Sequence, residues 1–138
     1  NGHATVLPLR AGAPMTAADA LPDLPGIDKA DGLRRMMNKP ELYERILRDV
    51  HTRTIDVPKA IRAALEQGDF TTAERQAHTT KGLAGTIGAL DLQSAAAALE
   101  KELHGSAMPS PDVFAQFEQA LRTVIEGIAA GFGIKSGS

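Results

Sequence analysis

Residues 77–90, AHTTKGLAGTIGAL, decide the fold of this chain and mark its most unusual surface. The stretch places a histidine, a lysine and three glycines where the flanking sequence has the spacing of a helix. Glycine in a helix interior costs about 1 kcal/mol relative to alanine, which the chain uses freely elsewhere. This loss of helix stability predicts that the surface beside His78 must be free of side chains so that something large can come close to it.

The helix around this stretch is predicted over residues 70–87 and has two distinct faces. At about 100° per residue, one narrow arc collects small and apolar side chains and is expected to be buried. Its members are Ala73, Ala77, Thr80, Ala84 and Ile87. A second arc holds His78, Gly82 and Gly85, with Thr71 and Arg75 near them and Lys81 between the two arcs. We expect the second arc to be a surface on which a large partner approaches His78, with a helix crossing at Gly85 as the alternative.

Helical spacing continues upstream of this segment. Residues 40–67 carry apolar side chains on one face but are interrupted at Pro58, which predicts one kinked helix or two stacked helices. A short helix is predicted within residues 27–37, with Asp28 as its N-cap. Asp69 is expected to cap the helix that carries His78.

Two more helices are predicted downstream, over residues 89–104 and 111–131. Gly88 is expected to end the helix before them as its C-cap. Short connections between amphipathic helices of similar length place neighbours antiparallel. The sequence therefore predicts an all-α fold, an antiparallel up-and-down four-helix bundle with a short extra N-terminal helix.

The domain boundaries follow changes in composition. Residues 1–25 contain four prolines and no sustained period, which predicts a linker or flexible arm. Residues 26–131 are expected to form the bundle, and residues 132–138 a C-terminal tail. We expect the isolated domain to be a monomer.

Composition excludes several classes of function. The net charge of −2 provides no basic field for nucleic acid. The chain has no cysteine, and hence no disulfide or thiolate zinc site. No apolar run has the roughly 20 residues that span a bilayer, so no direct membrane contact is expected. No glycine loop that cradles phosphate and no nucleotide-binding motif of an autokinase is present.

An exposed, unhindered imidazole with a lysine three residues later suits phosphoryl chemistry. A neutral histidine nitrogen can attack a phosphoryl group and hold it as a phosphoramidate. The ammonium group of Lys81 would offset part of the added negative charge. Such a site needs no pocket, because a partner can supply the metal and the other catalytic groups.

These residues also resemble a known family. The stretch HTTKGLAGTIGALDL, followed by Leu99 and Glu100, resembles the core motif of histidine-containing phosphotransfer (HPt) domains of bacterial phosphorelays. The upstream stretches PELYERILRDV, IRAALEQGDF and LPGID are similar to such domains at the C-terminal end of hybrid sensor histidine kinases. The resemblance spans roughly residues 25–130. The fold of the family that it implies is an antiparallel four-helix bundle, as the helix pattern also predicts.

The resemblance implies a role for each matching position. His78 would be the phospho-accepting residue, Lys81 would neutralise phosphate charge, and Gly82 would let a receiver domain approach. Glu100 would hydrogen-bond the ring nitrogen that is not phosphorylated and so orient the imidazole. Thr80 departs from the leucine found in many relatives, which affects local packing and leaves the chemistry intact.

The resemblance also implies a function. His78 would accept a phosphoryl group from the aspartyl phosphate of one response-regulator receiver domain and pass it to another. Mg²⁺ would be held by the receiver, so neither a metal nor a cofactor is expected on this chain. The domain would be cytoplasmic and lack its own kinase core. The sequence leaves open whether it stands alone or is the C-terminal module of a hybrid kinase, and whether such a kinase is anchored in the inner membrane.

Two other functions compete with this one. A phosphorylation-independent helical adaptor would bind a partner through the same patch around His78. A metal-binding bundle is the weaker choice, because Glu100 and His104 have the spacing of a ligand pair but no second pair is evident. His51 and His104 are otherwise expected to be solvated.

Overall fold

The computed structural model describes residues 16–135, and every regular element in that range is a helix. The elements are η1 (Ala18–Ala20), α2 (Lys29–Arg35), α3 (Pro40–Thr54), α4 (Val57–Glu66), α5 (Phe70–Ile87), α6 (Leu90–His104) and α7 (Pro111–Phe132). The all-α fold class is therefore confirmed, and the helices predicted downstream of residue 69 begin and end within a residue of their expected bounds.

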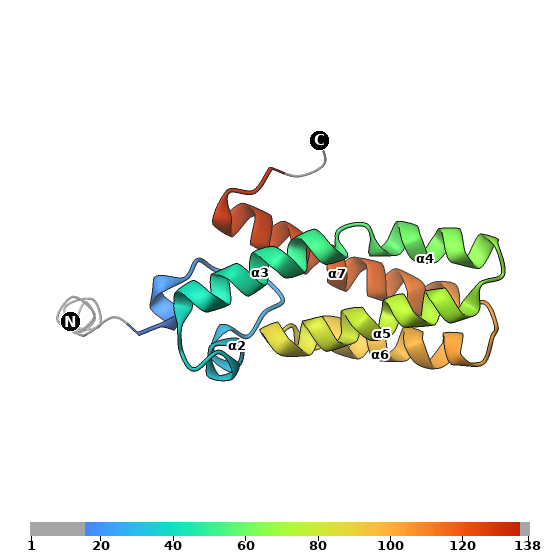
Figure 1. Cartoon of the computed structure of the whole chain (residues 1–138), viewed down its shortest axis with the longest axis horizontal. Helices are drawn as coiled ribbons and strands as arrows, with labels where there is room; N and C mark the ends of the chain where they lie inside the picture. The colour runs from blue at the N-terminus through green and yellow to red at the C-terminus, as the bar shows by residue number, and fades with distance from the viewer. Residues whose placement is uncertain (1–15, 136–138) are drawn as a thin grey trace, which may run out of the picture.

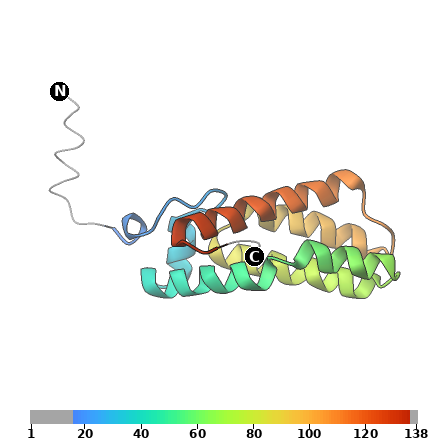
Figure 2. The same ribbon diagram turned by 90° about the horizontal axis from the view of Figure 1, so that it is seen from above.

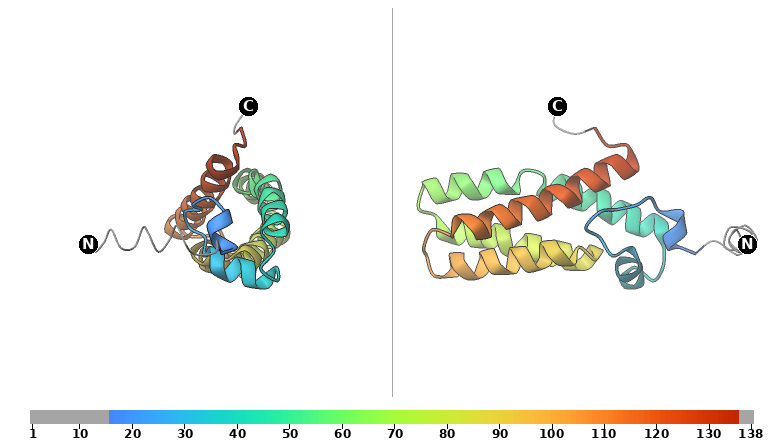
Figure 3. Two further views of the ribbon diagram at one scale, coloured as in Figure 1. Left: turned by 90° about the vertical axis from the view of Figure 1, so that its left-hand side faces the viewer. Right: turned by 180° about the vertical axis from the view of Figure 1, so that it is seen from behind.

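The helices form an elongated antiparallel bundle (Figure 1). Helices α5, α6 and α7 supply three of its four columns, and α3 followed by α4 supplies the fourth (Figure 2). Seen from one end, the helices surround a common core, and η1 and α2 lie at that end (Figure 3). This is the up-and-down four-helix bundle with a short extra helix that the sequence predicts.

Residues 40–67 form two helices rather than one kinked helix. Helix α3 ends at Thr54, and α4 begins at Val57, with Pro58 in its first turn. Proline has no backbone N–H to donate to the carbonyl one turn earlier, so a continuous helix would lose a hydrogen bond there. In the first turn of a new helix that N–H is not needed, and the break therefore falls just before Pro58.

The core is built from small and aliphatic side chains. All five members of the predicted apolar arc of α5 are buried, as are Leu92 and Leu99 of α6 and Phe117 and Leu121 of α7. Fully burying one such leucine or phenylalanine side chain contributes about 1.5–3 kcal/mol. The small alanines of α5 allow α6 to pack closely on it, and the two helices make the most extensive pairing in the described part of the fold.

Hydrogen bonds fix both ends of α5. The carboxylate of Asp69 accepts a hydrogen bond from the backbone N–H of Thr72 at 3.0 Å. At the other end Gly88 has φ +84°, and a Cβ there would stand 2.4 Å from the carbonyl oxygen of Asp28. Gly88 is thus a C-cap that only glycine can fill, and it ties α5 to the start of α2.

The buried Tyr43 adds a further tie between α3 and the end of α5. Its hydroxyl donates to the carbonyl oxygen of Ile87 at 2.5 Å. Burial raises the pKa of this hydroxyl far above its usual range, so Tyr43 stays protonated and remains a donor.

Part of the predicted N-terminal arm is packed. Leu21 and Leu24 are buried, and Pro25 lies so close to α7 that a Cβ on Gly127 would come within 2.8 Å of its ring. Residues 16–25 therefore lie against the bundle, which corrects the expectation of a flexible arm for that part. The proline-rich composition hid this contact, because it has no helical or strand period. Residues 1–15 of the arm lie outside the described residues.

The C-terminal end of the predicted bundle also extends slightly. Helix α7 runs to Phe132 and is ended by Gly133 at φ +67°. Ile134, in the predicted tail, packs against the hydrophobic core. The last residues of the tail, 136–138, lie outside the described part of the chain.

Candidate functional site

His78 lies near the middle of α5 with its side chain 64% exposed. Its Nδ1 is 2.7 Å from Oε2 of Glu100, which projects from the neighbouring helix α6. A carboxylate can only accept a hydrogen bond, so Nδ1 must carry the proton that is shared. In the neutral ring the other nitrogen, Nε2, then holds the lone pair. The contact between the two helices thus selects one tautomer of an exposed imidazole.

Glu100 also binds the side chain of Lys81. The ammonium group of Lys81 is 2.7 Å from Oε1, the other oxygen of the carboxylate. The hydrogen bond from Lys81, and to a smaller extent that from His78, lowers the pKa of Glu100 below its usual value of 4.5 against the opposing effect of burial. Glu100 is therefore ionised at neutral pH, and it holds Lys81 beside the imidazole.

The two glycines near His78 have different surroundings. Gly82 is exposed, and a Cβ built on it meets nothing within 4 Å. No packing within the described chain requires a glycine there. Gly85 is buried, and a Cβ on it would stand 2.6 Å from Nε2 of Gln93 on α6. Gly85 is thus a helix-crossing contact, which corrects its predicted place on the exposed surface.

Thr71 and Arg75 are exposed on α5 upstream of His78, as expected. The structure thus brings His78, Lys81 and Glu100 into direct contact, with Gly82 open beside them. Thr71 and Arg75 form no hydrogen bond or ion pair with these three side chains, and their part in partner binding stays a prediction.

His51 is buried, which corrects the expectation that it is solvated. Its side chain lies on the inner face of α3, and the residue is 5% exposed. Its Nε2 has no hydrogen-bond partner among the described residues. Burial lowers the pKa of His51, so the ring is neutral at pH 7. Its helical spacing from Leu47 and Thr54 was a signal of this burial in the sequence.

The pair of Glu100 and His104 that suggested a metal site is divided between two contacts. Glu100 binds His78, whereas Nδ1 of His104 is 2.9 Å from Oε2 of Glu74 on α5. Within residues 16–135 no three His, Cys, Asp or Glu side chains gather closely enough to hold a metal ion. Sequence reasoning missed Glu74, although its register on an antiparallel helix places it opposite His104.

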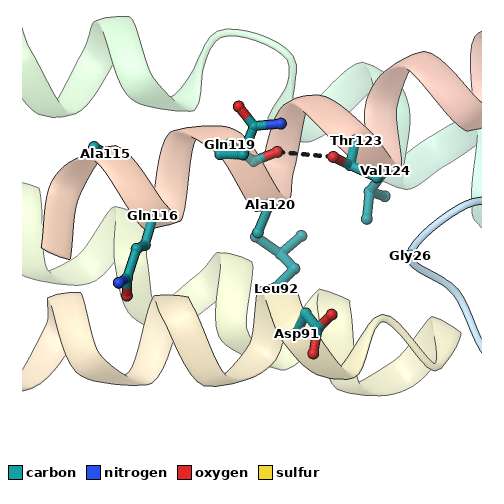
Figure 4. Close-up of a pocket in the computed structure, with 9 residues that line it drawn as sticks. All are labelled: Gly26, Asp91, Leu92, Ala115, Gln116, Gln119, Ala120, Thr123 and Val124. Atoms are coloured by element: carbon teal, nitrogen blue, oxygen red, sulfur yellow. Dashed lines mark hydrogen bonds between the residues drawn. The ribbon is translucent and has the colours of Figure 1, made fainter. Parts of the chain in front are cut away.

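A surface pocket of about 480 Å³ lies elsewhere, between α6, α7 and the N-terminal segment (Figure 4). Its walls include Leu92, Ala120 and Val124, and Asp91 is its one ionisable lining residue. None of the predicted site residues lines it. The chemistry expected of this chain therefore belongs to the exposed face of α5 and α6 and not to this pocket.

Comparison with known proteins agrees with the geometry. The family model of the Hpt domain matches residues 55–131, from the turn before α4 to the last turn of α7. The chain belongs to the Hpt domain family. No curated protein and no solved structure gives a significant match. Hpt domains carry out histidine phosphotransfer in phosphorelays and interact with response-regulator receiver domains.

The family match covers both helices of the site. Helices α5 and α6, with His78 and Glu100, lie wholly inside the matched range, whereas α2 and α3 precede it. No helix among residues 16–135 combines the length and apolar character needed to cross a membrane.

Proposed function

We propose that His78 is the phosphoryl-accepting residue of this Hpt domain and that Nε2 is the accepting atom. The observation that carries the proposal is the 2.7 Å contact between Nδ1 of His78 and Glu100. It favours the tautomer whose lone pair is on Nε2, and the ring is exposed to a partner. The ring of His51 is not open to a partner, because it is buried.

The transfer step follows from this tautomer. The lone pair of Nε2 attacks the phosphorus of an aspartyl phosphate on a receiver domain, and the bond between phosphorus and the aspartate oxygen breaks. The leaving electrons return to the aspartate carboxylate. The ring keeps its Nδ1 proton and becomes an imidazolium, whose positive charge faces the ionised Glu100. Attack by the carboxylate of a second receiver reverses the step and frees the histidine.

Lys81 and Gly82 support the same step in different ways. The ammonium of Lys81, held beside the ring by Glu100, offsets part of the negative charge of the phosphoryl group. Gly82 leaves open space one turn from His78, where a receiver must come close. The receiver would supply Mg²⁺ and the acidic residues that hold it.

The test is transfer between two purified receiver domains through this domain. With the wild-type chain, phosphoryl label passes from the first receiver to residue 78 and then to the second. In His78→Gln no label reaches the second receiver, whereas Thr79→Ala, a neighbouring exposed change on α5, keeps the transfer. Transfer that persists in His78→Gln contradicts the assignment. Receiver binding without any transfer in the wild type would instead favour a phosphorylation-independent adaptor.

A further inference from the structure

A second imidazole on the same face is held in the same manner as His78. Nδ1 of His104 is 2.9 Å from Oε2 of Glu74, and Nδ1 of His78 is 2.7 Å from Oε2 of Glu100. In each pair the histidine and the glutamate come from different helices, α5 and α6. The Hpt family match and the function proposed above assign no role to His104 or Glu74.

The two pairs arise from one repeated pattern. Each helix carries a glutamate four residues before a histidine, Glu74 and His78 on α5 and Glu100 and His104 on α6. Helices α5 and α6 run antiparallel as a hairpin (Figure 1). Each glutamate therefore lies opposite the histidine of the other helix. The close approach of Gly85 on α5 to Gln93 on α6 fits the same alignment of the two helices. The pairs are therefore related by an approximate two-fold axis across the hairpin.

The chemical state of His104 follows the argument used for His78. The carboxylate of Glu74 can only accept, so Nδ1 carries the proton and Nε2 of the neutral ring holds the lone pair. The side chain of His104 is 81% exposed, more than that of His78. A small phosphoryl donor therefore has access to this nitrogen.

The surface between the two pairs places two ammonium groups beside the two carboxylates. A shallow hollow of about 430 Å³ is lined by His104 together with Lys81 and Lys101, and by Glu74, Glu100 and Ala97. Lys101 lies three residues before His104 on α6, as Lys81 lies three residues after His78 on α5. Within residues 16–135 Lys101 forms no ion pair, so its ammonium group is available to an added phosphoryl group.

We propose that His104 is a second phosphoryl-accepting residue of this domain, with Nε2 as the accepting atom and small-molecule acyl phosphates or phosphoramidate, not the aspartyl phosphate of a receiver domain, as donors. The Nε2 lone pair forms the bond to phosphorus, and the bond from phosphorus to the donor's oxygen or nitrogen breaks. The leaving carboxylate or ammonia takes the electron pair. The Nδ1 proton stays on the ring, and Glu74 faces the resulting positive charge. The proposal uses the chemistry proposed for His78 but does not require that His78 react.

Two features make His104 the slower acceptor. It is the last residue of α6, where the unpaired carbonyl groups of the final turn disfavour added negative charge. Lys81 is already bound to Glu100, on the side of the other pair. We therefore expect phosphorylation of His104 to lag behind that of His78 with the same donor.

The test is reaction of the whole chain with phosphoramidate, followed by mass mapping of the occupancy at each histidine. His78→Gln is expected to gain label at residue 104, and His104→Gln at residue 78. Glu74→Gln keeps an acceptor oxygen but loses the charge, so it should slow labelling of His104 about tenfold and leave His78 unchanged. Glu100→Gln is the matched control. It should slow the labelling of His78 and leave that of His104 unchanged.

Two results would overturn the proposal. One is the absence of label at residue 104 in His78→Gln while a folded helical spectrum is retained. The other is labelling of His104 at the same rate in the wild type and in Glu74→Gln, which would make it an ordinary exposed imidazole. If the wild-type chain carries label at residue 104 but none at residue 78, the function proposed for His78 is overturned instead. The two failures are therefore distinct.

Discussion

At the scale of single residues, the carboxylate of Glu100 organises the site because it binds His78 and Lys81 at once. The resemblance to Hpt domains predicted the contact with His78 from the motif. It did not predict the ion pair with Lys81, since that pair depends on how two long side chains meet across the interface of α5 and α6. The burial of His51 was also missed, because a lone histidine among charged residues gives a weak signal of an inner face.

Replacing Lys81 by alanine is expected to shorten the lifetime of the phosphohistidine at residue 78. Without its ammonium group, residue 81 no longer offsets the phosphoryl charge. For a partly exposed ion pair this loss should shorten the lifetime about fivefold. The measurement is the decay of label at residue 78 after the donor is removed. Lys101→Ala, a lysine on α6 outside this ion pair, is the control and should leave the decay unchanged. Equal decay in Lys81→Ala and wild type would remove Lys81 from the mechanism.

The pKa of Glu100 gives a second prediction at this scale. In the folded chain it lies below the usual 4.5, chiefly because of the hydrogen bond from Lys81. Lys81→Ala should therefore raise the pKa of Glu100, and by more than His78→Gln does. A titration of the ¹³C-labelled carboxyl groups by NMR measures both shifts, and an unmoved pKa in Lys81→Ala would contradict the ion pair.

The sign of the linked stability change follows from this shift. The folded chain holds the Glu100 proton less tightly than the unfolded chain does. The contribution of Glu100 to stability is thus complete above pH 4.5 and is lost as the pH falls through the lower folded value. The stability difference between wild type and Glu100→Gln should shrink over that acidic range.

At the scale of elements, the glycines of α5 divide into two kinds that the helical wheel placed together. Gly82 faces open space, whereas Gly85 faces Gln93 of α6. An angle around one helix axis cannot separate them, because the difference depends on where the neighbouring helix crosses. The bounds of α5 itself were predictable, since Asp69 and Gly88 are strong local signals of a helix start and end.

The change Gly82→Gln should stabilise the fold and impair transfer. Its side chain meets no described atom nearby, and removing a helix glycine gains about 0.5–1 kcal/mol. The same side chain stands where a receiver must approach, so transfer from the receiver to His78 should fall at least about tenfold. Urea unfolding and the transfer rate are measured on the same sample.

Gly85→Ala is the matched control for this prediction. It removes a glycine from the same helix, but its methyl group displaces only the flexible end of Gln93. We expect transfer to His78 to be unchanged and stability to shift by less than about 1 kcal/mol. Normal transfer in Gly82→Gln would contradict the open docking surface.

At the scale of the whole molecule, α3 to α7 form the bundle, and residues 16–25 lie against it. The bundle was predictable because each long helix has a regular apolar face and because short connections join neighbouring helices. The packing of Leu21 and Leu24 was not, since a proline-rich segment has no period from which burial can be inferred. The division of residues 40–67 into α3 and α4 was also open, because a proline kinks a helix or ends it depending on packing.

Replacing Leu24 by alanine tests this packing. Leu24 is only 5% exposed and approaches α7 near Gly131, so the change should destabilise the fold by about 2–3 kcal/mol. Met108→Ala, whose side chain is 65% exposed, is the control and should be nearly neutral. Both free energies of unfolding come from urea titrations. A neutral effect of Leu24→Ala would mean that this segment does not pack on the bundle in solution.

The central claim is that Nε2 of His78 receives the phosphoryl group. Its most direct test is ¹⁵N NMR of the histidine side chains while the labelled domain reacts with a phosphorylated receiver. We predict a bond from phosphorus to Nε2 of His78, with Nδ1 protonated and its proton still held by Glu100. A phosphoryl group on Nδ1, or a His78 ring that is unchanged while the domain takes up phosphate, would contradict the account.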